Sequence, residues 1–425
     1  MKIGKFAAES TTVLGKMRLQ LGGGLVLAAL APYVLREWLD PDRVDLANLH
    51  NSLIGTIVAL VAGYLGFRQT SHYPGMRASY GILPSFSISY GLVMAGFLML
   101  RLDYSRLQFV ASYLFCVIWF YLVYRGLKSH RAVFGVLPFG RASELTTVDG
   151  PQWIILEPDL AEIGRFDAIV ADLHADIPDW WERFLADQAL NGVPVLHVKQ
   201  VKESLTGRVE IERLSENDFG SLIPGMAFAK LKRMVDFVSA LALFLPLLVA
   251  LVPVAIAIKL DSKGPVFFRQ PRVGYRGAKF TLHKLRTMQV RSPAEAGQRI
   301  EDAMTRSDDE RVTRLGRFLR KYRIDELPQV LNILAGEMSW IGPRPEAIPL
   351  SEWYESELPF YRYRHIVRPG LSGWAQVNQG HVADVADVLW KLHYDFYYIR
   401  NFSIWLDLLI VGRTVRTVLS GFGHK

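Results

Sequence analysis

The sequence predicts a membrane protein that is mainly α-helical, and three observations carry this prediction. Apolar residues make up 50% of the 425 residues and charged residues only 21%, which exceeds the hydrophobicity that a soluble protein requires. Four long apolar runs lie within residues 1–130. A fifth run, further along, contains prolines and has basic residues at both ends. We therefore expect a four-helix transmembrane bundle, a small α/β middle domain, and a C-terminal α/β domain with a re-entrant helix and interfacial amphipathic helices.

Each of the four N-terminal runs approaches the ~20 residues that an α-helix needs to cross ~30 Å of hydrocarbon. They are Met17–Leu35, Ser52–Phe67, Gly81–Leu100 and Leu107–Tyr124. The alternative is a set of buried core helices, which is disfavoured because little polar sequence lies between the runs to cover a soluble core. No A-x-A-like cleavage site follows the first run, so we expect this run to stay as a membrane anchor.

Basic residues in the flanks of these runs predict their orientation, because Lys and Arg concentrate on the cytoplasmic side. One set of flanks contains Lys2, Lys5, Lys16, Arg18, Arg68, Arg77, Arg125, Lys128 and Arg131. The other two loops contain only Arg36, Arg43, Arg101 and Arg106. An N-terminus in the cytoplasm, four crossings and a cytoplasmic remainder are consistent with these positions.

The fifth apolar run, Val235–Leu260, is long enough to span a membrane but has the cytoplasmic signature at both ends. The basic residues that flank it are Lys230, Lys232, Arg233, Lys259, Lys263, Arg269 and Arg272. A full span would leave one set on the wrong side. Pro246 lies near the middle of the run, where it removes a backbone donor and kinks a helix, and Pro253 adds a second break. We therefore predict a re-entrant helix pair over residues 235–260, broken at Pro246, with a full span as the alternative.

The stretch between the two membrane regions reads as a small α/β domain, of a degenerate Rossmann-like kind. It has four short apolar segments and one amphipathic helix: Val133–Val136, Trp153–Leu156, Ala168–Leu173, Val193–Val198 and Pro178–Leu190. No G-x-G-x-x-G fingerprint is present, so we expect no dinucleotide site there. The predicted domains are residues 1–130, 131–225 and 226–425.

Charge and cysteine content narrow the classes of function. The net charge of +8 could face nucleic acid, anionic lipid or a phosphorylated substrate. A single cysteine, Cys116, excludes an intrachain disulfide and any cysteine-based zinc site. A DNA-binding protein does not need five embedded apolar runs, so we expect no nucleic-acid partner.

The C-terminal part of the chain contains several basic clusters. Alternation around Phe280–Leu285 predicts a strand that carries Lys284 and Arg286 on one face, since residues two apart share a side. A solvated basic edge strand is the competing interpretation. The segment Gly342-Pro343-Arg344-Pro345 predicts a stiff loop that presents Arg344 in a fixed direction. Apolar residues in Ile404–Leu419 alternate with arginines as in an interfacial helix.

A further basic segment, Arg311 to Gln329, ends in two adjacent carboxylates. Val312, Leu315, Leu319 and Tyr322 recur at helical spacing, with arginines on the remaining surface, which suits a lipid headgroup interface. Asp325 and Glu326 follow, and Pro328 fits the first turn of a new helix. Asp325 could be a simple helix N-cap. Alternatively, two carboxylates at a helix N-terminus beside arginines could hold cations and phosphates.

Taken together, these clusters resemble the bacterial sugar transferase family, the monotopic phosphoglycosyl transferases that act on polyprenyl phosphate. The resemblance covers about Phe228–Lys425 and has the family's motifs in order. It implies transfer of a sugar 1-phosphate from a UDP-sugar to undecaprenyl phosphate with release of UMP. That reaction begins the assembly of exopolysaccharide, capsule or O-antigen. The resemblance also implies a multi-pass protein of the bacterial inner membrane with its catalytic domain on the cytoplasmic face.

The resemblance assigns roles to individual residues. Asp325 would be the nucleophile that forms an aspartyl-phosphosugar, and Glu326 would help Asp325 to hold Mg²⁺. The remaining assignments are Lys284 in the K-[FL]-R-T-M motif, Arg320 and Arg344 as phosphate-binding arginines, Asp395 as a further acidic residue of the active site, and Pro246 as the proline that breaks the re-entrant helix. We add Arg286 as a substrate-binding candidate, because it shares a strand face with Lys284.

The expected partners are a UDP-sugar, undecaprenyl phosphate and membrane lipid. A non-catalytic membrane scaffold for a polysaccharide assembly complex is the alternative function, in which Asp325 and Glu326 would only cap a helix. No motif contacts a particular sugar hydroxyl, so the identity of the sugar stays open. The membrane spans or the α/β domain could support a homodimer.

Overall fold

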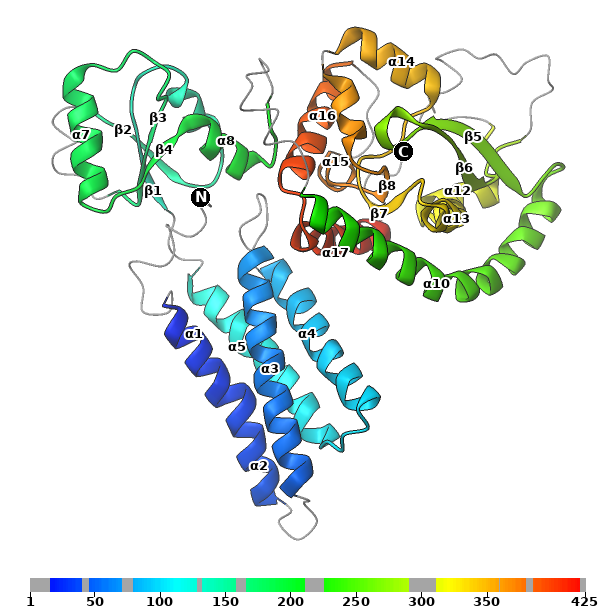
Figure 1. The fold of residues 1–425 in the computed structure, drawn as a ribbon, viewed down its shortest axis with the longest axis horizontal. Coiled ribbons are helices and arrows are strands. Elements are labelled where there is room, and N and C mark those ends of the chain that lie inside the picture. The colour runs from blue at the N-terminus through cyan, green and yellow to red at the C-terminus, as the bar shows by residue number, and fades with distance from the viewer. Residues whose placement is uncertain are drawn as a thin grey trace. The chain divides into compact units, whose positions relative to one another are not determined.

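The computed structural model describes residues 16–39, 46–70, 79–127, 132–157, 166–210, 225–289, 311–358, 360–379 and 385–420. The chain divides into two compact units, Met1–Gly207 and Arg208–Lys425, and each is described by itself (Figure 1). As predicted, the protein is mostly helical, with apolar helices at its N-terminal end and a small α/β region. The division into three domains at residues 130 and 225 stays a prediction.

The four predicted apolar runs form helices in the first unit. The first contains a π-helical segment, and its parts are α1 (Met17–Gly24), η3 (Leu25–Leu30) and α2 (Ala31–Leu39). The others are α3 (Leu46–Thr70), α4 (Ser79–Met99) and α5 (Arg106–Leu127). Including α10 of the second unit, five helices of the described chain are long and apolar enough to cross a membrane. The protein is therefore a membrane protein.

These helices pack through aromatic side chains and close approach of small residues. Phe86 on α4 stacks on Phe120 of α5 with ring centroids 4.6 Å apart. Gly63 on α3 faces Phe86 so closely that an added Cβ would lie 2.4 Å from that ring. Large apolar side chains such as Leu92 and Leu122 point outward and are more than half exposed. An apolar exterior around a packed interior is the arrangement that lipid solvates best.

The α/β region is a four-stranded parallel sheet in the order β2-β1-β3-β4. Its elements are β1 (Val133–Val136), η5 (Ala142–Thr147), β2 (Gln152–Ile155), β3 (Ala168–Ala171), α7 (Asp179–Leu190), β4 (Val195–His197) and α8 (Val198–Thr206). Every residue of β3 is buried, as a central parallel strand requires when both faces are covered. The four predicted strands and the predicted helix are confirmed.

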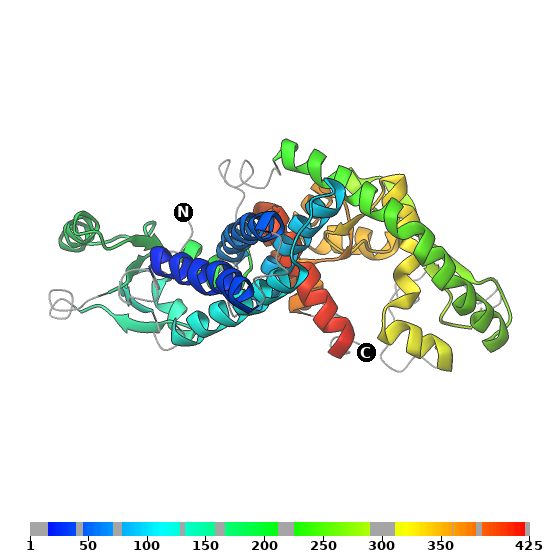
Figure 2. The ribbon, with the colours of Figure 1, turned by 90° about the horizontal axis from the view of Figure 1, so that it is seen from below.

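The second unit begins with α10 (Met226–Asp261), a helix of 36 residues that includes both Pro246 and Pro253. The helix continues past both prolines, which differs from the predicted pair of separate helices. A proline removes one backbone donor and bends the axis, while the neighbouring turns keep their bonds. Figure 1 shows α10 as a curved helix, and Figure 2 shows it running along one edge of this unit.

Both ends of α10 attach to the same folded unit. Near its start, Lys232 Nζ lies 2.6 Å from Asp407 Oδ2, and Arg233 Nη1 donates to Ile333 O at 2.6 Å. Near its end, Arg286 Nη2 donates to Ile258 O and to Ser262 O. Between these anchors the helix is apolar and mostly exposed: Leu241, Leu245, Leu248, Val249, Val252 and Ile256 are each at least half exposed.

The remainder of this unit consists of short elements around two small sheets. The first sheet is an antiparallel hairpin of β5 (Phe267–Val273) and β6 (Lys279–Leu285), and the second is a parallel pair of β7 (Ser339–Ile341) and β8 (Gly370–Ser372). The helices are η6 (Tyr275–Gly277), α12 (Arg314–Lys321), η7 (Ile324–Gln329), α13 (Val330–Ala335), α14 (Ile348–Glu357), η8 (Tyr361–Ile366), α15 (Trp374–Asn378), α16 (Val385–Arg400) and α17 (Ile404–Ser420). The predicted strand around Phe280–Leu285 is confirmed as β6.

Candidate active site

The strand that carries Lys284 is fastened to the helix that follows the two carboxylates. Asn332 on α13 is 1% exposed, and its side-chain amide both donates a hydrogen bond to the backbone of β6 and accepts one from it. Its Nδ2 donates to Thr281 O at 2.7 Å, and its Oδ1 accepts from His283 N at 3.2 Å. These bonds fix the register of β6 against α13. Lys284, the next residue of the strand, is thereby held beside Glu326.

Asp325 and Glu326 lie in η7, a 3-10 turn directly before α13. The chain enters this turn through Arg323, whose φ of 55° is left-handed and costs a non-glycine residue free energy. Both carboxylates are nearly buried, with exposed fractions of 8% and 5%. The predicted position of this pair at the start of a helix is confirmed to within one turn.

Glu326 is surrounded by three cations. Its Oε1 accepts from Arg344 Nη2 at 2.7 Å and from Lys284 Nζ at 3.2 Å, and its Oε2 lies 3.6 Å from Arg323 Nη1. Burial alone would raise the pKa of this carboxyl, but Arg344, Lys284 and Arg323 together hold it far below its usual range. Glu326 is therefore an anion at any physiological pH.

Asp325 is in the opposite electrostatic situation. Among the residues that the structure describes, no side chain or amide forms a hydrogen bond or salt bridge with its carboxylate. Burial and the adjacent charge of Glu326 raise the pKa of Asp325, while Lys284, Arg320 and Arg344 partly offset the rise. Two neighbouring carboxyls whose pKa values are pushed apart are typical of groups with different chemical roles.

The structure brings four of the predicted residues into one group: Lys284, Arg344, Asp325 and Glu326. Burial lowers the pKa of Lys284, and the charge of Glu326 counteracts that effect. Arg320 is close enough to lower the pKa of Asp325, and its Nε donates to Thr287 Oγ1 at 2.9 Å. This group could bind a diphosphate through its cations while leaving one carboxylate free.

Two other predicted residues make contacts of a different kind. Arg286 follows the last residue of β6, and its Nη2 donates to Ile258 O, Ser262 O and Ser262 Oγ at the C-terminal end of α10. Asp395 on α16 is 1% exposed and accepts two hydrogen bonds from Arg364. Their predicted roles in substrate binding and catalysis stay predictions, and the contacts show that each stabilises a neighbouring element.

Five further charged residues near this group were not predicted as site residues: Arg272, Arg323, Glu346, Arg364 and Lys391. Glu346, which is 9% exposed, contacts Lys391, Arg272 and Arg364. These partners are 45, 74 and 18 residues away along the chain. The one local signal was the position of Glu346, directly after the Pro-Arg-Pro loop.

The oxygen donors of this group fit a divalent cation. Mg²⁺ is commonly held by one or two carboxylates together with substrate phosphates and water. Asp325 has a carboxylate without a partner in the described chain, next to the ionised Glu326. Oxygen-only ligands with a net negative charge suit Mg²⁺ better than Zn²⁺, which prefers nitrogen and sulfur.

A second cluster, in the α/β region, has the residue types of a metal site, but nitrogens of both its histidines are engaged in hydrogen bonds. Ligand atoms of Asp172, His174 and His197 lie within 4.8 Å of one another. Lys199 N donates to His197 Nδ1 at 3.0 Å, so the neutral ring carries its proton on Nε2. That nitrogen faces His174 Nδ1 at 2.8 Å and donates to it. The cluster is therefore a hydrogen-bonded end of the sheet.

Comparison with known proteins decides the family. Residues 227–421 match the family model described as bacterial sugar transferase. The chain is 43% identical over 414 residues to a UDP-N-acetylgalactosamine-undecaprenyl-phosphate N-acetylgalactosaminephosphotransferase from Aeromonas hydrophila, with 95% of this chain and 94% of that protein covered. The chain belongs to the bacterial sugar transferase family. It is an enzyme of the undecaprenyl-phosphate sugar phosphotransferase type.

Other relatives of this sugar transferase match over about half of its length. It is 45% identical over 206 residues to a UDP-glucose:undecaprenyl-phosphate glucose-1-phosphate transferase from Caulobacter vibrioides, which covers 47% of this chain and 74% of that protein. A protein of the same description from Escherichia coli is 40% identical over 197 residues, or 46% of this chain and 41% of that one. The segment matched by the family model, residues 227–421, contains the carboxylate pair and its cations.

Proposed function

We propose that the enzyme transfers a sugar 1-phosphate from a UDP-sugar to undecaprenyl phosphate through an aspartyl-phosphosugar, with release of UMP. This would be the initiating step of exopolysaccharide, capsule or O-antigen assembly. The proposal rests on the different environments of the two carboxylates. Glu326 is bound by three cations, whereas Asp325 has no partner in the described chain. A free, buried carboxylate beside several cations is suited to attack an anionic substrate.

The proposed reaction has two displacement steps at one phosphorus. First, an Asp325 carboxylate oxygen bonds to the phosphorus that bears the sugar, and the bond from that phosphorus to the bridging oxygen breaks. UMP leaves with the electron pair. Then a phosphate oxygen of undecaprenyl phosphate attacks the same phosphorus and Asp325 leaves as a carboxylate. The products are undecaprenyl-diphosphate-sugar and regenerated enzyme.

An anionic nucleophile approaching a diphosphate is opposed by charge repulsion, which the cations of the site would offset. Lys284 and Arg344 already share one oxygen of Glu326, and Arg320 influences Asp325. We assign these three residues to the phosphate oxygens of the substrate. Bound Mg²⁺, held by Asp325 and Glu326, would supply further neutralisation of the phosphate charge.

The attachment of α10 supports a re-entrant helix with the active site at headgroup height. Lys232 and Arg233 at one end, and Ile258 and Ser262 at the other, all contact the same C-terminal unit. A helix whose two ends bind one folded unit cannot place them on opposite sides of a bilayer unless that unit crosses it too. We propose that this unit lies on the cytoplasmic face of the inner membrane.

Cysteine labelling tests this topology. Cys116 is buried, so a Cys116→Ala background leaves no native thiol to react. Lys230→Cys and Lys263→Cys flank the apolar part of α10, and we expect a membrane-impermeant maleimide to label both only after the cytoplasmic face is opened. A Leu102→Cys control, in the connection between α4 and α5, is expected to react from the outside of intact cells. Labelling of Lys263→Cys together with this control would indicate a full span.

The reaction itself is tested by the nucleotide that is released. Purified enzyme with undecaprenyl phosphate and a panel of UDP-N-acetylgalactosamine, UDP-glucose and UDP-galactose should release UMP with at least one donor. UDP-N-acetylgalactosamine is the first choice, because the relative named for that sugar matches along nearly the whole chain. Release of UDP would indicate ordinary glycosyl transfer and contradict the proposal. Absence of turnover with every sugar nucleotide would instead favour the scaffold alternative.

The pH dependence of kcat/KM should reveal the coupling between the two carboxylates. Attack requires ionised Asp325, so activity falls as pH drops through the raised pKa of that residue. Glu326→Gln removes a neighbouring negative charge, which lowers the pKa of Asp325. We expect the acidic limb of the profile to move to lower pH in this variant, although kcat/KM is reduced at every pH. Glu326→Asp retains the charge and should leave the limb near its original position; a limb that rises in Glu326→Gln would contradict this assignment.

A further inference from the structure

The loop that presents Arg344 is held mainly through its carbonyl groups, together with the Gly342 N–H, which donates to Ser372 O at 2.9 Å. Pro343 and Pro345 have no backbone N–H, so the loop has few donors with which to attach itself to its surroundings. Pro343 O accepts from Gly370 N at 2.9 Å. The next two carbonyls are bound by arginine side chains: Arg364 Nη2 donates to Arg344 O at 2.9 Å, and Arg272 Nη1 donates to Pro345 O at 3.0 Å.

Arg364 is buried, so its positive charge and its N–H donors must be satisfied by neighbouring residues. Its side chain is 2% exposed, and a buried guanidinium is stable only with a counter-ion and filled donor positions. Asp395 supplies the charge, with its Oδ2 2.8 Å from Nη2 and 3.1 Å from Nε. Nη1 donates to Tyr361 Oη at 2.6 Å. The Asp395 carboxylate thus orients the guanidinium that binds the Arg344 carbonyl.

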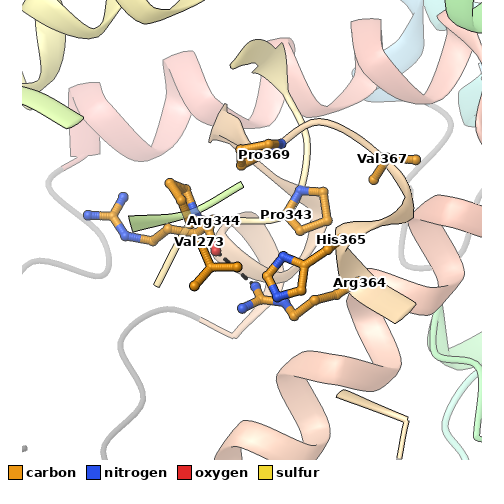
Figure 3. Close-up of a pocket in the computed structure, with 8 residues that line it drawn as sticks. Val273, Pro343, Arg344, Arg364, His365, Val367 and Pro369 are labelled. Carbon is orange, nitrogen blue, oxygen red and sulfur yellow. Dashed lines mark hydrogen bonds between the residues drawn. The ribbon is translucent and has the colours of Figure 1, made fainter. Parts of the chain in front are cut away.

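Figure 3 shows this arrangement in a close-up of the small pocket that the loop helps to line. The side chain of Arg344 extends to one side, and Arg364 lies on the other side with its bond to the Arg344 carbonyl drawn. Glu346 supports the same group, because its carboxylate binds Lys391 and lies 3.8 Å from Arg272 and 3.9 Å from Arg364. The backbone of Arg344 is therefore fixed by the buried Arg364 on one side, while its guanidinium binds Glu326 on the other.

We propose that Arg364 is a positioning residue for Arg344 and that Asp395 acts on the reaction only through Arg364. Asp395 is 1% exposed and, within the described chain, both of its side-chain hydrogen bonds come from Arg364, so it has almost no surface to offer a substrate or a metal ion. The inference rests on the proposed function, since it takes Arg344 to bind the phosphates. It replaces a catalytic role for Asp395 by an orienting one.

A double-mutant cycle in kcat/KM tests the inference. A displacement of about 1 Å in a substrate-binding group can cost about 10²-fold in rate. We expect Asp395→Asn and Arg364→Lys each to lower kcat/KM by about 10²-fold, and the double variant to lose about the same amount. Lysine keeps the charge for Asp395 but cannot also reach the carbonyl of Arg344. Losses that multiply to about 10⁴-fold would overturn the proposal, because independent sites add in free energy.

Measuring Asp395→Asn in an Arg344→Ala background separates a positioning role from a general effect on folding. In Arg344→Ala the loop no longer carries the guanidinium, so the direction of the loop ceases to matter. Asp395→Asn should then cost less than about threefold, within the error of additivity. A residue that merely stabilised the fold, or that touched the substrate itself, would still cost about 10²-fold in that background, and this outcome would overturn the inference.

The controls use the same helical turn and the same assay. Arg362 lies two residues from Arg364 but is 79% exposed, and it pairs with Glu355 on the surface. Arg362→Gln should keep full kcat/KM, and melting curves of all variants establish the folded fraction to which rates are normalised. The wild-type enzyme must first release UMP. A wild type without UMP release refutes the proposed function, whereas an active wild type with multiplicative losses refutes only the positioning role.

Discussion

Asp325→Asn is expected to lower turnover by at least about 10⁴-fold, because an amide cannot replace a carboxylate nucleophile. The substitution changes little in shape, and Asp325 has no partner in the described chain that would lose a bond. Folding should therefore be preserved. With UDP-sugar labelled in its β-phosphate and no acceptor lipid, wild-type enzyme should become labelled on Asp325 and release one equivalent of UMP. The variant should show neither event.

Mass spectrometry of peptides that contain residue 325 measures the adduct directly. Asp387→Asn is a matched control, since Asp387 is exposed on α16 in the same unit. We expect it to keep both the label and the turnover of the wild type. An Asp325→Asn enzyme that retains turnover, or a label on another residue of the wild type, would remove Asp325 as the nucleophile. Glu326 would then be the first residue to examine.

Arg344→Ala is expected to have the second largest effect, a loss of about 10²–10³-fold in kcat/KM. Removing one preorganised donor from a transition state typically costs this much. The guanidinium lies 2.7 Å from Glu326 Oε1, and the charge of Glu326 raises the pKa of Arg344, so it is a permanent cation. Loss of this cation also leaves Glu326 with Lys284 and Arg323 as its remaining ion-pair partners in the described chain.

The separate effects on kcat and KM show at which stage of the reaction Arg344 acts. If Arg344 acts mainly on the charge that develops during phosphoryl transfer, kcat falls and KM changes little. Arg344→Lys should recover part of kcat, because it restores the charge without the planar pair of donors. Arg362→Ala removes an exposed arginine from the same unit and should have no effect. A kcat equal to that of the wild type in Arg344→Ala would contradict the assignment of Arg344 to the phosphates.

Residues close together in the sequence were predicted well. Asp325 and Glu326 are adjacent and precede a helix, so their neighbourhood could be inferred from local spacing. The alternation around Phe280–Leu285 likewise predicted the strand that carries Lys284. The long apolar runs predicted the helices of the first unit, because length and apolar composition are properties of a continuous segment.

Contacts between distant segments were not predictable in the same way. Alternation placed Arg286 beside Lys284, but β6 ends at Leu285 and the Arg286 side chain binds the end of α10. Asp395 was recognised only through the family resemblance, and its partner Arg364 was not recognised at all. A single sequence contains no signal for which arginine meets which carboxylate when 31 residues separate them.

The sequence by itself determined that this is a membrane protein, where its apolar helices lie, and which two carboxylates stand together in a basic setting. Only the tertiary structure decided that Glu326 is bound by Lys284, Arg323 and Arg344 while Asp325 is left without a partner in the described chain. The length of an apolar segment is a property of consecutive residues and can be read directly from the sequence. The difference between two adjacent carboxylates depends on burial and on charges that folding brings from other segments.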